Sequence, residues 1–241
     1  MNISEKIQKR IKTISEDTTF GYEQLGITQT EFQAAAKVIE RLLKKGIIKK
    51  SSKGVFYKPR ITVFGELKPS DETILRQYLF EDGKRIAYIT GTALYNQLGL
   101  TTQMAFIFQI ASRKKRIYIN TSAIKAKPVK SYAEVTDKNY QLLGFLDAIK
   151  DIKIIPDTST DDIVMALSTK INRFSESEIK MLVKYSFLYP ARTRALLGAI
   201  LESLKKESLL TYLKKSLNPL TKYKIGLSSN VLPTALNWNI K

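Results

Sequence analysis

The segment from Thr28 to Arg60 constrains the fold of this chain more than any other. Thr28 and Glu31 have the spacing of a capping box, in which a threonine hydroxyl and a glutamate carboxylate satisfy backbone amides at the start of a helix. Gly46 can adopt the positive φ that ends a helix, and two short β-rich runs follow it within residues 47–58. The sequence therefore predicts a helix, a glycine stop and a β-hairpin in close succession.

The helix that begins at Thr28 is predicted to be amphipathic. Six apolar residues at helical spacing form the expected core face: Phe32, Ala35, Ala36, Ile39, Leu42 and Leu43. The opposite face carries short or polar side chains: Thr30, Gln33, Ala34, Lys37, Arg41 and Lys44. Gln33 can bond an adenine edge, and Thr30 and Lys37 can reach bases or phosphates. This face suits the major groove of DNA.

The hairpin expected after Gly46 is strongly basic, because residues 41–60 contain eight Lys or Arg and no acid. Five of its residues are predicted to lie beside a phosphate backbone: Lys49, Lys50, Ser51, Ser52 and Lys53. An amphipathic helix is also expected over residues 3–15. This order of elements predicts a winged helix-turn-helix that binds duplex DNA. The alternative is a solvated amphipathic helix followed by an ordinary charged hairpin.

Composition favours a polyanionic partner and disfavours most enzyme chemistry. The formal charge is +18 and the isoelectric point is about 9.8, which strengthens association with phosphate backbones. The chain has no Cys and no His, so thiolate nucleophiles, Ser–His pairs and most zinc sites are excluded. We see no apolar run long enough to span a membrane and no signal peptide, and we expect a cytoplasmic protein.

The pattern of elements predicts an α+β chain in three parts. Apolar runs at 105–111 and 117–120 read as strands joined by a cationic hairpin tip, Ser112–Arg116. Most of the remaining signals, from about residue 137 onward, are helical. We therefore expect a winged helix-turn-helix domain over residues 1–60, an α+β domain with C-terminal helices over residues 61–217, and a polar tail over residues 218–241.

A second basic surface is a further candidate site. No acid occurs between Ala111 and Ser131, and seven cations of this region form the candidate: Arg113, Lys114, Lys115, Arg116, Lys125, Lys127 and Lys130. They can contact phosphate or an acidic partner. Alternatively, they can be solvated charges that protect an edge strand from aggregation.

The clustered acids Asp157, Asp161 and Asp162 are the one arrangement that could hold Mg²⁺. Acids that precede a helix more commonly stabilise its positive end. We therefore expect no metal site, no cofactor and no catalytic residue.

Three segments resemble the antitoxins of the abortive-infection AbiE type, from the type IV toxin–antitoxin systems of bacteria. The first runs from Gly46-Ile47-Ile48-Lys49-Lys50 into Gly54-Val55-Phe56-Tyr57-Lys58-Pro59. The second joins Gly91-Thr92-Ala93-Leu94 to Leu98-Gly99-Leu100-Thr101-Thr102-Gln103. The third is Tyr189-Pro190-Ala191-Arg192-Thr193-Arg194-Ala195-Leu196-Leu197. Together they cover roughly residues 1–200.

This resemblance implies a non-enzymatic antitoxin that acts in phage defence. Such a protein represses its own operon through the winged helix and counteracts a nucleotidyltransferase-like toxin, often without a stable complex. Winged-helix repressors commonly face inverted half-sites, so the expected operator contains inverted repeats. The resemblance carries the DNA contacts onto Thr30, Gln33 and Lys37 and onto residues 49–53.

Two other functions remain open at this point. One is a winged-helix transcriptional regulator whose second domain senses a small ligand, since an apolar pocket leaves no motif in a sequence. The other is a Mg²⁺-dependent enzyme acting on nucleic acid, which would have to work with carboxylates, Lys or Tyr.

Overall fold

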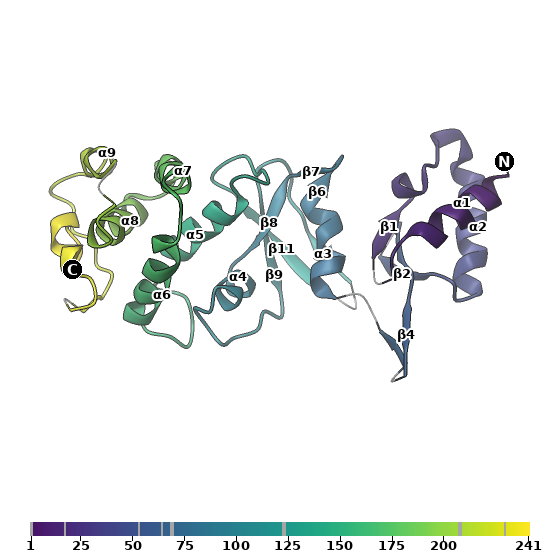
Figure 1. The fold of residues 1–241 in the computed structure, drawn as a ribbon, viewed down its shortest axis with the longest axis horizontal. Helices are drawn as coiled ribbons and strands as arrows, with labels where there is room; N and C mark the ends of the chain where they lie inside the picture. The colour runs from purple at the N-terminus through teal and green to yellow at the C-terminus, as the bar shows by residue number, and fades with distance from the viewer. Residues whose placement is uncertain are drawn as a thin grey trace. The chain divides into compact units, whose positions relative to one another are not determined.

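The computed structural model describes residues 2–16, 18–52, 54–63, 65–67, 70–121, 124–206, 209–228 and 230–241, without the side chains of Ser52, Leu67 and Glu72. The fold is α+β, which confirms the class predicted from the sequence. The chain divides into two compact units (Figure 1). Unit 1 is Met1–Asp82 with Asn120–Ile124, and unit 2 is Gly83–Ile119 with Lys125–Lys241.

Unit 1 begins with helical segments and a small sheet that enclose one hydrophobic core. The elements are α1 (Ile3–Thr13), β1 (Thr19–Gly21), the 3₁₀ turns η1 (Glu23–Leu25) and η2 (Gln29–Glu31), α2 (Phe32–Lys44), β2 (Lys49–Ser52) and β3 (Val55–Tyr57). The strands form an antiparallel sheet in the order β1-β3-β2. Ten buried side chains form the core: Ile7, Ile11, Phe20, Leu25, Ala35, Val38, Ile39, Leu42, Ile48 and Phe56.

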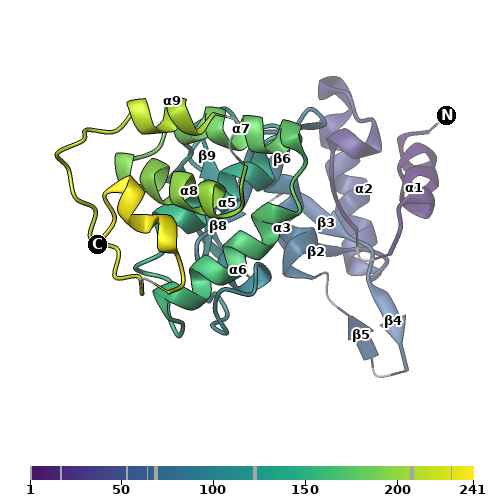
Figure 2. The same cartoon turned by 60° about the vertical axis from the view of Figure 1, so that its left-hand side comes forward.

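A second hairpin and a third helix complete unit 1. Strands β4 (Arg60–Thr62) and β5 (Gly65–Leu67) pair antiparallel and extend away from α1 and α2 (Figure 2). Helix α3 (Asp71–Leu79) follows, and Ser70 caps it by accepting from the Thr73 amide. Two short strands, β6 (Phe80–Glu81) and β7 (Lys84–Arg85), then carry the chain into unit 2.

Unit 2 contains a four-stranded sheet with one parallel pair. Its strands are β8 (Ala87–Thr90), β9 (Phe108–Ser112), β10 (Ile119–Asn120) and β11 (Lys125–Lys130), in the order β10-β11-β9-β8. β8 and β9 are antiparallel, whereas β9 and β11 are parallel. Helix α4 (Thr92–Gln97) lies against β8 and β9. The predicted hairpin across residues 112–116 is wrong, because β11 lies between β9 and β10 and the segment is a crossover.

Helices fill the remainder of unit 2. They are α5 (Tyr140–Lys150), α6 (Thr160–Asn172), α7 (Glu176–Ser186), α8 (Ala191–Ser203), α9 (Leu210–Lys215) and the 3₁₀ segment η3 (Pro233–Trp238). Helices α5 to α9 lie on one side of the sheet (Figure 1). Ser159 and Ser175 cap α6 and α7 by accepting from the amides of Asp162 and Glu178. Among the described residues, none of the helices has the length and apolar character that crossing a membrane requires.

The C-terminal segment packs into the core of unit 2. Its polar and proline-punctuated sequence predicted a tail over residues 218–241, yet six side chains of this segment are buried: Tyr223, Ile225, Leu232, Ala235, Trp238 and Ile240. Trp238 is 2% exposed, and an added Cβ at Gly198 of α8 would lie 2.2 Å from its ring. Helix α8 therefore accommodates the indole because it has no side chain at that position.

A buried carboxylate joins the sheet of unit 2 to its helices. Asp147 of α5 accepts hydrogen bonds at Oδ2 from Thr90 Oγ1 (2.7 Å) and from the Tyr88 hydroxyl (2.9 Å). Its Oδ1 accepts from the Tyr189 hydroxyl at 3.0 Å. Burial raises the pKa of Asp147, and these hydrogen bonds partly oppose that shift. The carboxylate thus connects β8, α5 and the link between α7 and α8.

Candidate nucleic-acid interface

The start of α2 is fixed by the capping box that the sequence predicted. The Thr28 amide donates to Glu31 Oε2 at 3.0 Å. The same carboxylate pairs with Lys6 of α1 at 3.0 Å. The backbone hydrogen bond from Thr28, followed by the Lys6 ammonium, lowers the pKa of Glu31. The capped residues form the 3₁₀ turn η2, so the α-helix proper begins at Phe32 rather than at the cap.

The face of α2 that was predicted to read DNA is exposed along its whole length. The residues concerned are Thr30, Gln33, Ala34, Lys37, Arg41 and Lys44. Their spacing of three or four residues places them on one stripe. The side chain of Arg41 folds back along this stripe, where its Nε donates to the Lys37 carbonyl at 3.4 Å. The structure thus places Thr30, Gln33, Lys37 and Arg41 on a single accessible face.

The predicted core face of α2 was only partly correct. Ala35, Ile39 and Leu42 are buried as expected, together with Val38, which the sequence reading omitted. Phe32 lies at the helix start and is 48% exposed. Its ring packs against Tyr22, with centroids 4.7 Å apart, and not within the core. Phe32 therefore belongs to the surface near the candidate site rather than to the core.

The end of α2 turns the chain directly into the basic hairpin. Gly46 adopts φ +69°, and its amide donates to the Leu43 carbonyl at 3.0 Å. The Ile47 amide donates to the Leu42 carbonyl at 3.1 Å. These two bonds satisfy carbonyls of the last helical turn, as in a Schellman-type cap, so the predicted glycine stop is confirmed.

Strands β2 and β3 form the basic hairpin, with Lys49 opposite Tyr57 and Lys50 opposite Phe56. A register shift between Lys50 and Ser52 marks a bulge, which strengthens local twist. Lys50 is exposed, whereas Ser51 is half-buried and its Oγ has no hydrogen-bond partner among the described residues. The candidate contact Lys53 and the side chain of Ser52 lie outside the described residues.

The sequence reading missed a carboxylate partner for one of the hairpin lysines. Lys49 Nζ forms an ion pair with Glu66 Oε2 of β5, and the Tyr57 hydroxyl donates to Glu66 Oε1 at 3.5 Å. The hydrogen bond to Glu66 raises the pKa of Lys49. The ammonium group of Lys49, one of the predicted phosphate contacts, is therefore already engaged by a carboxylate.

A hollow of about 490 Å³ adjoins the start of α2. Its lining combines η1, η2 and β1 with Phe32 and with Gly54 and Val55 at the beginning of β3. Tyr22 packs against Phe32 and meets Phe56 edge-on, with centroids 5.7 Å apart. The hollow thus separates the first turn of the exposed helix from the turn of the basic hairpin.

The second basic surface is not one patch. Lys125 and Lys127 are exposed on one face of β11, and alternation directs Lys130 to the other face. Arg113 donates to the Tyr132 carbonyl at 2.8 Å. The backbone amides of Lys114 and Lys115 donate to Ser112 Oγ, and Arg116 is exposed on the same crossover. The seven predicted cations therefore divide between a crossover segment and two faces of a strand.

The acidic cluster near α6 is engaged by the protein itself. Ser159 Oγ donates to Asp162 Oδ2 at 2.6 Å within the helix cap. Asp161 accepts from both the amide and the hydroxyl of Ser228, which lowers its pKa. Over the described ranges, groups of three or more potential metal-ligating side chains are absent.

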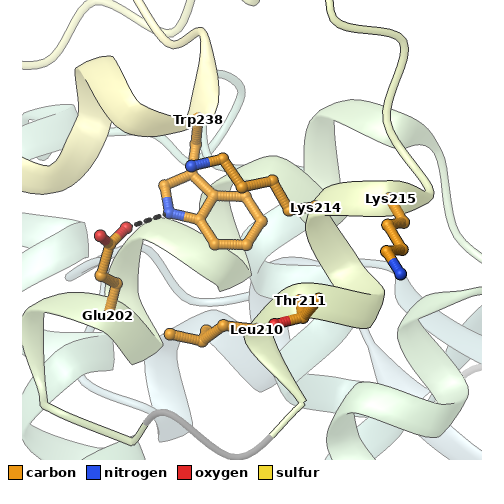
Figure 3. A pocket seen from close by; sticks show the side chains of 6 residues that line it. All are labelled: Glu202, Leu210, Thr211, Lys214, Lys215 and Trp238. Atoms are coloured by element: carbon orange, nitrogen blue, oxygen red, sulfur yellow. Dashed lines mark hydrogen bonds between the residues drawn. The ribbon is translucent and has the colours of Figure 1, made fainter.

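Unit 2 also contains a pocket of about 340 Å³. It is lined by Glu202, Leu210, Thr211, Lys214, Lys215 and Trp238 (Figure 3). The indole nitrogen of Trp238 donates to Glu202 Oε2 at 2.5 Å, and Lys214 Nζ lies 5.9 Å from the centre of the indole ring. The pocket thus combines an aromatic wall with two ammonium groups.

Comparison with known proteins gives a family and a structural neighbour. A family described as "Family of unknown function (DUF6088)" matches residues 6–174. A search of curated proteins gives no match. The crystal structure of the RV2827C protein from Mycobacterium tuberculosis is similar, with a TM-score of 0.55 and 11% sequence identity. The alignment covers 93% of this chain and 85% of that one, so the likeness concerns the fold.

Proposed function

The chain belongs to DUF6088, a family of unknown function, and we propose that it is an autoregulatory DNA-binding antitoxin. Unit 1 acts as a winged helix-turn-helix: α2 enters the major groove of duplex DNA, and the β2–β3 hairpin is the wing beside the backbone. The candidate contacts are Thr30, Gln33, Lys37 and Arg41 on α2 and residues 49–53 on the wing.

One observation carries the proposal. The polar stripe of α2 is exposed from Thr30 to Lys44, and the helix is followed directly by a hairpin whose Lys50 is also exposed. The opposite face of α2 is committed to the core through Ala35 and Leu42, so the stripe is left for an external partner. Its residues are those that pair with base edges and phosphates, and the +18 charge supports a polyanion.

Duplex binding is tested by fluorescence anisotropy with the promoter fragment of its own gene and with a random duplex. Gln33→Ala should reduce the preference for the promoter, at a cost of about 1–3 kcal/mol if the amide pairs with one base. Lys50→Ala should weaken both duplexes equally and flatten the salt dependence by about 0.9 log unit per phosphate contact. Lys180→Gln on α7 is the control, since it removes a charge from unit 2. A wild-type chain that binds neither duplex at low salt would exclude the proposal.

The antitoxin activity is proposed for unit 2 and is tested separately. The full chain is co-expressed with a nucleotidyltransferase-like toxin, taken from the gene next to its own if that gene encodes one, and growth is scored. We expect Gln33→Ala and Lys50→Ala chains to lose promoter repression while they still rescue growth. Failure of the wild-type chain to rescue growth would leave DNA binding intact and exclude the antitoxin activity.

The pocket at Trp238 favours a second candidate, a DNA-binding regulator whose unit 2 senses a ligand. An aromatic wall beside Lys214 and Lys215 suits a small anionic molecule with a flat ring. In that case, a ligand screen by thermal shift should find an anionic aromatic compound whose stabilising effect is lost in Lys214→Gln. The antitoxin proposal instead predicts growth rescue that is unaffected by that substitution.

A further inference from the structure

The sheet of unit 2 belongs to a stretch of chain without carboxylates. From Gly83 to Ala133 the sequence contains nine Lys or Arg and no Asp or Glu, although the whole chain has 22 acids. This stretch supplies β7 to β11, α4 and the loops between them. Because residues 83–133 contain no carboxylate to offset their lysines and arginines, the surface that they form is positively charged and complements an anionic partner.

One half of a sheet face is left open by the helices. Tyr88 and Thr90 of β8 bond to Asp147 of α5, which identifies the face that the helices cover. Along this face Thr90 is opposite Gln109 of β9, and Gln109 is opposite Lys127 of β11. Thr90 is buried, Gln109 is half-buried and Lys127 is exposed. Val129, two residues further along the same face of β11, still packs against the core, so the cover ends along β11 between Val129 and Lys127.

An aromatic side chain continues this row. β10 adjoins β11, and just beyond these two strands the Thr121 amide donates to the Ile124 carbonyl at 2.9 Å. Three residues before Thr121 is Tyr118, and three residues after Ile124 is Lys127, so an antiparallel hairpin places these two residues across from each other. Tyr118 is 71% exposed. The open half of the face thus carries Tyr118, Lys127 and Gln109 side by side, at about 4.8 Å per strand.

The start of the parallel pair adds a further contact group to the same edge. The register that places Ala126 beside Phe108 puts exposed Lys125 beside Ile107, one residue earlier. Phe106 precedes this pair and is 95% exposed. Phe106 lies in a bend before β9 and outside its register, so only Lys125, on the same face of β11 as Lys127, extends the open row.

We propose that Tyr118, Lys125, Lys127 and Gln109 bind a segment of single-stranded nucleic acid. Aromatic rings stack on bases that are free of a duplex, and lysines track the backbone phosphates. A duplex hides the faces of its bases, so an exposed ring favours a single strand over the partner of unit 1. The half-buried amide of Gln109 lies against Gly91 and borders the open row next to Lys127. This surface is independent of duplex binding by unit 1.

The test measures binding of the full-length chain to a fluorescent ten-nucleotide single strand of mixed sequence, as RNA and as DNA. Tyr118→Ala should weaken binding about 5- to 100-fold, the loss expected for one stacked base. Tyr118→Phe should retain binding and Tyr118→Leu should lose it, because stacking requires a ring and not merely an apolar side chain. Since Tyr118 is exposed, unchanged thermal melting is expected and excludes misfolding. The tighter of the two strands identifies the natural class of ligand.

Two matched controls separate a built site from general charge. Tyr212→Ala removes an exposed ring from α9, and Lys180→Gln with Lys184→Gln removes two charges from α7. These should leave single-strand affinity unchanged, whereas Lys125→Gln with Lys127→Gln should lower it and flatten its salt dependence. Binding should persist in Lys50→Ala, which impairs the duplex site only. Equal loss in the test and control variants, or equal affinity for a polyglutamate peptide, would overturn the proposal.

Discussion

In the proposed DNA complex, the ion pair between Lys49 and Glu66 limits how much of the hairpin's charge is available to phosphates. The ion pair joins β2 to the separate β4–β5 hairpin, so Glu66 occupies the ammonium group that a phosphate would bind. Glu66→Gln should therefore tighten binding to any duplex and steepen its salt dependence by up to about 0.9 log unit, the contribution of one phosphate contact. Anisotropy titrations at several salt concentrations measure both quantities.

Glu5→Gln is the matched control for this prediction. Glu5 is an exposed residue of α1, and its replacement changes the net charge of unit 1 by the same amount. The control should shift affinity less than Glu66→Gln does. If both substitutions act equally, the effect comes from total charge, and Glu66 does not restrain Lys49.

Asp147 couples the stability of unit 2 to pH. Burial raises the pKa of its folded-state carboxyl above the unfolded value of about 3.9, so the folded state holds the proton more tightly. The stability contributed by this group is complete below the unfolded pKa and is lost as pH rises through the folded pKa. The free energy of unfolding of the wild type, minus that of Asp147→Asn, should therefore fall as pH rises from about 4. Urea unfolding at several pH values measures this difference.

Asparagine is the informative replacement at this position because it can retain the hydrogen bonds. If the asparagine amide nitrogen takes the place of Oδ1, it can donate to the Tyr189 hydroxyl. The Tyr189 hydroxyl can then donate to the Leu143 carbonyl, which lies 3.2 Å away in the wild-type chain. Asp147→Ala instead leaves the hydroxyls of Tyr88 and Thr90 without this acceptor, at about 1–3 kcal/mol each. If the unfolding free energy of the wild type minus that of Asp147→Asn instead rises with pH, the hydrogen bonds to the Asp147 carboxylate lower its pKa by more than burial raises it.

At the scale of elements, the junction between α2 and β2 depends on Gly46. Its φ of +69° is strained for other residues, and an added Cβ would meet nothing within 4 Å. The cost of Gly46→Ala is therefore purely conformational, and it should destabilise unit 1 by about 1–2 kcal/mol. Gly46→Asn should cost less because asparagine tolerates this conformation better. Thermal denaturation followed by circular dichroism ranks the three chains; an alanine variant as stable as the wild type would contradict the prediction.

Local signals made the elements around this junction predictable from sequence. The cap at Thr28 and the stop at Gly46 depend on residues within one helical turn, and both are present. The exposed stripe of α2 followed from its 3.6-residue period. Phe32 was misplaced because η2 delays the helix and brings the ring beside Tyr22, which comes from a different element.

Nonlocal pairing explains what sequence reasoning could not find. Strand β11 contains three lysines and Pro128, a poor strand signal, yet it pairs with β9 in parallel register. The ion pair of Lys49 and Glu66 joins residues that no periodic pattern relates. The open face at Tyr118 likewise exists only because β10 folds back beside β11. Such features depend on topology, which a local pattern of residues does not encode.

At the scale of the whole molecule, the described residues form two hydrophobic cores with no residue in common. Unit 1 is built around α1 and α2, whereas the core of unit 2 includes the C-terminal Trp238. The chain has a single tryptophan, so its fluorescence reports on unit 2 alone. Far-ultraviolet circular dichroism reports on the helices of both units. The two signals together can separate the unfolding of one unit from that of the other.

Ile39→Ala is the substitution that uses this separation. Ile39 is 2% exposed in the core of unit 1, and its truncation should cost about 2–5 kcal/mol. Because the damage is confined to a core that Trp238 does not share, the dichroism should gain an early transition in urea while the fluorescence midpoint stays at the wild-type value. Ile200→Ala in the core of unit 2 is the reciprocal control and should shift the fluorescence midpoint. If Ile39→Ala moves both midpoints together, the two cores unfold as one cooperative unit.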